Sequence, residues 1–139
     1  MSFPTIEEFE SGEFDVAAFG HEAHVYVAWS YLRETDLLDA IARYRSALRQ
    51  LTRRLGAEGK YHETITWFYL VAIAERQASD PVADWPTFKR ANPDLLAVGG
   101  QWLCSYYSPK RLASMQARSS FLLPDRVPRI TRTQPVAGA

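Results

Sequence analysis

The sequence contains a single cysteine, only three histidines and no excess of charge of either sign. Because Cys104 has no partner within the chain, an internal disulfide is excluded, and its apolar context favours a core position over a nucleophilic role. Sixteen basic residues are balanced by sixteen acidic ones, so no overall field attracts nucleic acid or an anionic membrane. We therefore expect neither of these partners.

Long hydrophobic runs are missing as well. The longest, WFYLVAIA at 67–74, is far shorter than the roughly twenty residues needed to cross a bilayer. The first residues, MSFPTIEEFESGEF, have neither the charged start nor the apolar run of a signal peptide, so we expect a cytoplasmic protein. A hydrophobic content of 47% and a length of 139 residues are typical of one globular domain.

Apolar residues that recur every three or four positions indicate an all-α protein. A capping box formed by Thr5 and Glu8 predicts a short first helix that ends at Gly12. Further helices are expected at about 21–33, 36–55 and 61–79, with shorter ones over 85–91, 93–96, 101–107 and 109–120. We predict a single-domain bundle of five to seven helices over residues 1–125, followed by an extended or flexible tail over 126–139.

Two of these helices have distinctive patterns. Segment 61–79 is apolar nearly all round, which is typical of the central helix of a bundle. Segment 36–55 is two-faced, and its predicted buried face consists of Leu37, Leu38, Ile41, Tyr44, Leu48, Leu51 and Leu55. Its outer face carries Arg43, Arg45, Arg49, Arg53 and Arg54. This arginine face could attract an anionic ligand, but we interpret it as a solvated face.

The histidines are the residues best suited to proton transfer or metal binding near neutral pH. His21 and His24 lie three residues apart on one helix face, which continues inward through Ala28. His62 stands in the first turn expected for segment 61–79, where the helix dipole lowers the pKa of an imidazole. If the two helices pack together, these histidines and Glu63 could converge in one cavity.

This set predicts a site that holds a divalent metal, because three histidines, or two with a carboxylate, are the ligands of many zinc and non-haem iron sites. We expect His21, His24 and His62 to bind zinc or iron, with Glu63 as a ligand or general base and Tyr61 or Thr66 as a polarising donor. Without a metal, His21 and His24 could act as an acid and base pair.

The function predicted from this site is a small enzyme that acts on a small molecule by metal-assisted or acid and base chemistry. The alternative is a non-enzymatic helical module that binds a small molecule or a protein partner, with histidines that only satisfy helix ends.

Aromatic side chains form a second concentration, most of which we expect in the core. Some could wall a ligand pocket, and the residues that we expect to contact a substrate are Trp29, Trp67, Tyr106, Tyr107 and Arg118. The aromatic C-terminal half could also cover a second copy of the chain in a homodimer.

Four motifs carry a resemblance to a known family. They are F-x-H-x-x-H-V-x-x-A-x-x-Y-L at 19–32, K-Y-H-E-T-I-T at 60–66, A-N-P-D-L at 91–95, and the stretch from YYS at 106 to LPDR at 126. In these motifs the chain resembles a family of small, uncharacterised bacterial helical proteins. The resemblance implies one helical domain and the set His21, His24, His62 and Glu63, and it names no reaction.

Overall fold

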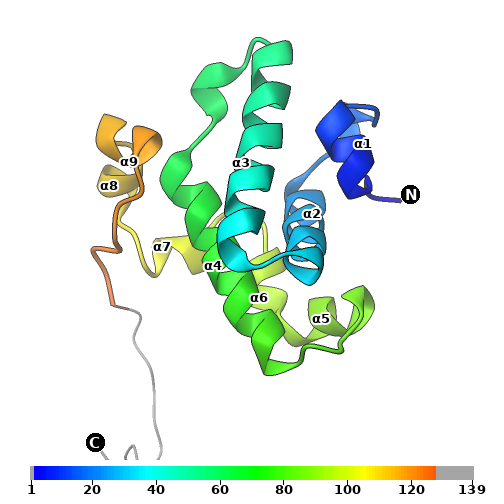
Figure 1. Ribbon diagram of the computed structural model, residues 1–139. Helices are drawn as coiled ribbons and strands as arrows, with labels where there is room; N and C mark the ends of the chain where they lie inside the picture. The colour runs from blue at the N-terminus through cyan, green and yellow to red at the C-terminus, as the bar shows by residue number, and fades with distance from the viewer. Residues whose placement is uncertain (1, 128–139) are drawn as a thin grey trace, which may run out of the picture.

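The computed structural model describes residues 2–127, and every regular element in this range is helical (Figure 1). The α-helices are α1 (Ile6–Ser11), α2 (His21–Glu34), α3 (Leu37–Arg54), α4 (Glu63–Ser79), α5 (Trp85–Ala91), α6 (Pro93–Leu96), α7 (Gln101–Cys104), α8 (Pro109–Leu112) and α9 (Met115–Ser119), with two 3-10 turns, η1 (Val16–Ala18) and η2 (Glu58–Lys60). The prediction of an all-α bundle is confirmed for these residues. None of these helices is long and apolar enough to cross a membrane.

The described residues form more helices than the five to seven expected, because the C-terminal part is divided into short pieces. The helix predicted over 109–120 is two helices, since the hydroxyl of Ser114 accepts the amide N–H of Ala117 and begins α9. Residues 121–127 have no regular structure, and the rest of the predicted tail, 128–139, lies outside the described residues.

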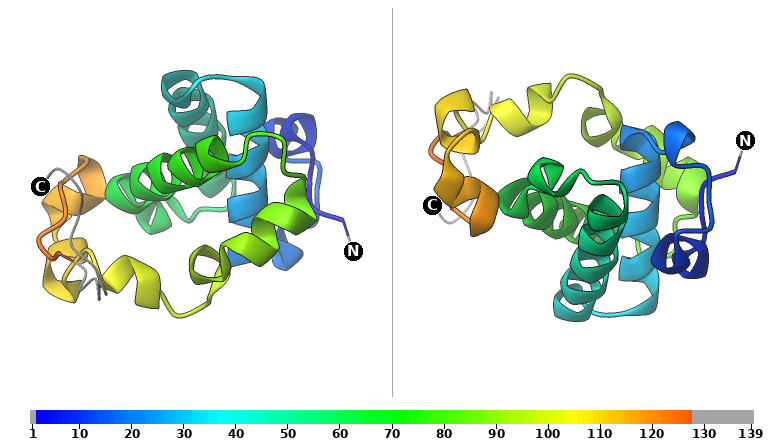
Figure 2. Two further views of the ribbon diagram at one scale, coloured as in Figure 1. Left: turned by 90° about the horizontal axis from the view of Figure 1, so that it is seen from below. Right: turned by 90° about the horizontal axis from the view of Figure 1, so that it is seen from above.

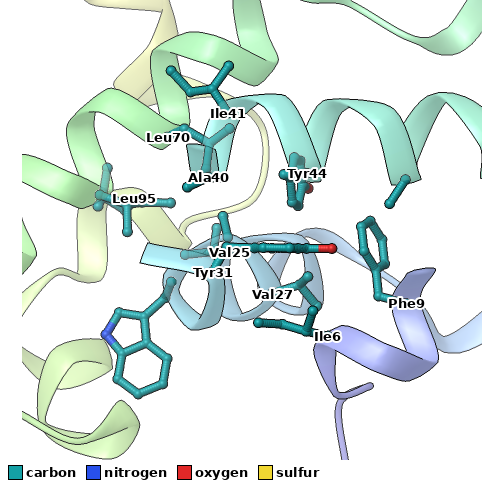
Figure 3. Close-up of a cluster of buried hydrophobic side chains, with 14 of the residues drawn as sticks. Ile6, Phe9, Val25, Val27, Tyr31, Ala40, Ile41, Tyr44, Leu70 and Leu95 are labelled. Carbon is teal, nitrogen blue, oxygen red and sulfur yellow. The ribbon is translucent and has the colours of Figure 1, made fainter. Parts of the chain in front are cut away.

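Helices α2, α3 and α4 pack on one another and enclose the core, and α1 contacts both α2 and α3. Figure 3 shows Tyr31 of α2 and Tyr44 of α3 lying between their helices, with Phe9 of α1 beside them. The rings of Phe9 and Tyr44 are stacked with centroids 5.4 Å apart, and Tyr31 meets Tyr44 edge to face. Aromatic side chains thus join the first three helices, as the composition predicts.

Helix α3 buries one face, as its periodicity predicts. Its buried residues are Ala40, Ile41, Tyr44, Ala47 and Leu51. Two predicted members of this face are wrong: Leu38 is 77% exposed and Leu55 is 53% exposed. Leu38 lies in the first helical turn, and Leu55 is already the C-cap, so the neighbouring helices do not cover these ends of α3.

The central position predicted for the fourth long helix is confirmed, because α4 contacts α2, α3 and α9. The C-terminal segment is attached to α4 through Thr64, which is fully buried. The Thr64 hydroxyl lies 2.7 Å and 2.8 Å from the carbonyl oxygens of Ala117 and Ser120, and it accepts the amide N–H of Leu122. Figure 2 shows the result: α8 and α9 lie at one end of the molecule and α1 at the other.

Candidate functional site

A cavity of about 510 Å³ lies between α2, α3 and α4, and all three histidines line it. We call it the histidine cavity. Its wall is mainly apolar, and the aromatic and polar side chains that interrupt this wall include His21, His24, Tyr44, Tyr61, His62, Thr66 and Tyr69. The packing of α2 against α4 therefore brings together residues that are about forty positions apart in the sequence.

His24 is neutral at physiological pH. Burial lowers its pKa to about 4, and the charge of the neighbouring His21 acts in the same direction. Its Nδ1 lies 3.0 Å from the hydroxyl oxygen of Tyr44, and the ring of Phe19 packs against it with centroids 4.2 Å apart. These contacts hold an uncharged imidazole on the cavity wall.

His21 is held by a backbone carbonyl group of α6. Its Nε2–H donates a hydrogen bond of 2.8 Å to the carbonyl oxygen of Leu95, and the tautomer that makes this contact carries its proton on Nε2. Nδ1 therefore carries a lone pair, and it has no hydrogen-bond partner within residues 2–127. The ring of Tyr69 lies edge to face with His21 at 5.3 Å between centroids.

His62 is the N-cap of α4, and both of its ring nitrogens are engaged. Nδ1 accepts the amide N–H of Ile65 at 3.2 Å, and Nε2–H donates to the carbonyl oxygen of Leu112 at 2.7 Å. The pKa of His62 is lowered, chiefly by burial. The direction agrees with the sequence-based expectation, but the largest cause is loss of solvent rather than the helix dipole.

These geometries bear on the predicted metal. Within residues 2–127 no group of three or more His, Cys, Asp or Glu side chains lies in an arrangement that could hold a metal ion. The Nδ1 lone pair of His62 is used by the helix cap, so a metal would have to displace this contact. Binding of zinc or iron by His21, His24 and His62 stays a prediction.

Glu63 does not line the histidine cavity. Its two carboxylate oxygens share the Nε–H of Arg45, at 2.8 Å and 3.0 Å, and Oε1 also accepts the hydroxyl of Tyr61. Burial, the largest single influence, raises the pKa of Glu63, but the hydrogen bonds from Arg45 and Tyr61 and the charge of Arg45 outweigh it and hold the pKa below its usual range. Glu63 is thus an ionised partner of Arg45.

A second cavity, of about 420 Å³, lies on the other side of Tyr61, and we call it the arginine cleft. Four arginines line it: Arg45, Arg49 and Arg53 of α3 and Arg118 of α9. Glu58 and Glu63 are its only carboxylates among the described residues. Tyr61 and Thr52 line both cavities and form the wall between them.

The predicted donors Tyr61 and Thr66 line the histidine cavity, whereas the predicted substrate contacts do not. Thr66 donates its hydroxyl to the carbonyl oxygen of His62 at 2.8 Å. Arg118 lines the arginine cleft. The four aromatic residues predicted to contact a substrate lie outside both cavities, in packed aromatic clusters. They are Trp29, Trp67, Tyr106 and Tyr107.

These four aromatic residues serve packing. Trp29 packs between Tyr26, Trp85 and Phe88, and Trp67 stacks on Phe121. Tyr107 is fully buried and donates its hydroxyl to the carbonyl oxygen of Leu122 at 2.7 Å. Tyr106 and Tyr107 both contact the ring of Phe68.

Sequence reasoning missed two residues of the histidine cavity, Tyr44 and Tyr69. Tyr44 was assigned to the buried face of α3, and its fully buried hydroxyl needs a hydrogen-bond partner. That requirement is the signal that could have linked Tyr44 to His24. The sequence carries no comparable signal for Tyr69, whose role depends on how α4 rotates against α2.

Two of the sequence motifs meet at this cavity, since Phe19, His21 and His24 come from one, and Tyr61 and His62 from the other. Comparison of the chain with protein-family models, with curated proteins and with solved structures gives no match. The geometry of the two cavities is therefore the basis for the functional argument.

Proposed function

We propose that this protein binds a small, mainly apolar molecule that carries a hydroxyl or N–H donor, in the histidine cavity. The volume of about 510 Å³ is within the range of cavities that hold small molecules, and the wall combines apolar side chains with a few polar groups. The same combination is typical of binding sites in which apolar contact supplies affinity and single hydrogen bonds set orientation.

The observation that carries this proposal is the Nδ1 atom of His21. Its lone pair has no partner among the described residues, while the other ring nitrogen is held by Leu95. A ligand that fills the cavity would exclude water from this lone pair, so it should donate a hydrogen bond to it. Because His24 is neutral, with a pKa of about 4, no imidazolium there calls for an anion.

The second candidate is the acid and base enzyme predicted from the sequence. It is favoured by the same free lone pair on His21, which could accept a proton from a substrate. The support is weaker because this chemistry pairs His21 with His24, and a pKa of about 4 places His24 far below the working pH at which a general acid or base is most effective. The pKa of His24 agrees better with a binding protein. In such a protein the hydrogen bonds of His62 and the contact of His21 with Leu95 serve structure.

Isothermal titration calorimetry with two matched probes tests the proposal. 2-Naphthol donates a hydrogen bond, and 2-methoxynaphthalene has nearly the same shape without this donor. We expect 2-naphthol to bind at one site per chain, roughly fivefold tighter than the ether, since a net hydrogen bond contributes about 1 kcal/mol. The variants Leu48→Trp and Ile65→Trp place an indole in the cavity and should abolish binding of both probes.

The control is Leu38→Trp, because Leu38 is 77% exposed and lies outside the cavity. It should bind 2-naphthol as the unaltered chain does, and thermal unfolding confirms that each variant is folded. Absence of saturable binding by the unaltered chain, or equal loss in Leu38→Trp, contradicts the proposal. Equal affinity for the two probes contradicts the role of His21.

A further inference from the structure

The arginine cleft brings positive charge together from two helices that are distant in sequence. Arg45, Arg49 and Arg53 are spaced four residues apart, so they follow one another along one face of α3. Arg118 reaches the same cleft from α9, which packs on α4. Neighbouring like charges on a helix repel one another, so this arrangement costs stability unless an anion offsets it.

The charge in the cleft is only partly balanced by the protein. Four guanidinium groups stand against the carboxylates of Glu58 and Glu63, which leaves two positive charges. Arg45 is paired with Glu63, but Arg49 and Arg53 have no carboxylate within 4.0 Å among residues 2–127. The excess in the cleft contrasts with the net charge of zero of the whole chain.

Three of the four guanidinium groups, those of Arg45, Arg49 and Arg118, are held by contacts with the protein. Glu63, itself only 7% exposed, accepts from Nε of Arg45, and the hydroxyl of Tyr61 also lies beside this guanidinium. The guanidinium of Arg49 lies over the ring of Tyr61 at 5.8 Å from its centroid. Arg118 donates to the carbonyl oxygen of Gly59. Preorganised donors lose less entropy when an anion binds.

We propose that the arginine cleft binds the phosphate group of a small phosphorylated molecule. A phosphate monoester carries up to two negative charges near neutral pH, which matches the two unbalanced positive charges of the cleft. Guanidinium groups bind phosphate oxygens with paired N–H donors, and Arg49 and Arg53 both have these donors unused within residues 2–127. The volume of about 420 Å³ suits a small molecule.

A nucleic acid is the less favoured partner of these arginines. A nucleic acid polymer needs a basic stripe that extends along the surface. The chain as a whole has a net charge of zero, so the part outside the cleft has no excess of positive charge. The cleft is bounded by α3, by the segment from η2 to the start of α4, and by α9, so it presents a local site.

Titration of the 15N-labelled protein with inorganic phosphate, at constant ionic strength kept with sodium chloride, tests the proposal. We expect saturating NMR shifts that are concentrated at the backbone amides of Thr52, Gly59 and Ser119. The double variant R49Q/R53Q should weaken phosphate binding at least tenfold, because a hydrogen bond to a charged group contributes on the order of a tenfold factor. R118Q tests the same site from α9.

The matched control is R90Q/K110Q, which removes two positive charges at exposed positions outside the cleft. It should bind phosphate within about twofold of the unaltered chain, since distant surface charges are largely screened. Shifts that stay linear with phosphate concentration, or equal weakening in the control, overturn the proposal. Binding of a twelve-nucleotide thymidine oligomer without saturation by phosphate overturns it in favour of nucleic acid. Binding of 2-naphthol by R49Q/R53Q keeps this test separate from that of the histidine cavity.

Discussion

The hydroxyl of Tyr61 donates a hydrogen bond to Oε1 of Glu63, and through this contact one phenol ring closes the wall between two cavities of different character. On one side lies the mainly apolar histidine cavity, and on the other lies the arginine cleft. Glu63 holds Arg45 at the same time, so the wall and the charged cleft depend on one buried carboxylate.

Glu63→Gln should destabilise the protein by about 1–2 kcal/mol, because it leaves Arg45 without its charge partner and replaces one of the two oxygens that accept from Nε by an NH2 group. The measurement is the free energy of unfolding from urea denaturation. The double variant E63Q/R45Q completes a thermodynamic cycle, and a coupling energy below about 0.3 kcal/mol would contradict the role of this pair.

The matched control for this ion pair is Glu22→Gln. Glu22 contacts Lys89 at 2.9 Å, but both side chains are more than one third exposed. Exposed pairs contribute little in water, so we expect a change below about 0.5 kcal/mol.

Tyr44→Phe should lower the free energy of unfolding by about 1–2 kcal/mol, because it removes the only hydrogen bond that the described residues make to the His24 ring. Tyr26→Phe is the control, since no partner of the Tyr26 hydroxyl is found within residues 2–127 and its loss should be nearly neutral. If the two variants are equally stable, the contact between Tyr44 and His24 contributes nothing measurable.

Stability should fall as the pH is lowered from about 6.5 to 4 because of His24. In the unfolded chain this imidazole takes up a proton with the ordinary pKa of 6.5, whereas burial lowers the folded-state pKa to about 4. Protons therefore bind preferentially to the unfolded chain below pH 6.5, and the loss should reach roughly 3 kcal/mol by pH 4. Urea denaturation at intervals of half a pH unit measures this dependence.

The variant His24→Gln identifies the source of this pH dependence. It should be less stable than the unaltered chain at pH 7.5, and its stability should change much less between pH 6.5 and 4.5. His62 contributes in the same direction, since its pKa is also lowered, so a smaller slope should remain. An unchanged slope would show that His24 titrates normally in the folded protein.

Thr64→Val should loosen the C-terminal segment. The substitution keeps the shape of the buried side chain and removes the hydroxyl that contacts Ala117, Ser120 and Leu122, which should cost about 2–3 kcal/mol. Hydrogen exchange should become faster over 115–127 and stay slow in α2 and α3. Thr64→Ser keeps the hydroxyl, so it should retain the slow exchange of this segment, and similar exchange in both variants would assign the attachment to packing alone.

Local signals in the sequence predicted most helix boundaries. The capping box of Thr5 and Glu8 is confirmed, because it is a contact between residues only three positions apart. Ser114 was missed as a cap because the surrounding residues continue an acceptable helical pattern.

The site was predictable only in part, because it depends on contacts between distant segments. The spacing of His21 and His24 placed them on one inward face, and both line the cavity. His62 is the extended N-cap and Glu63 the first helical residue of α4, and their side chains line different cavities. Arg118 lies in the same cleft as the arginines of α3 because α9 packs on α4. No local sequence pattern specifies this packing.

The attachment of α9 through Thr64 has a consequence for the order in which the protein is completed on the ribosome. The histidine cavity is built from residues 16–73, so its walls can assemble early in synthesis. Arg118 follows Ile73, the last lining residue of this cavity, by 45 residues, which at roughly 5–20 residues per second means a delay of about 2–9 seconds. During this interval the lining residues of the apolar pocket are already synthesised, whereas the last wall of the arginine cleft is not.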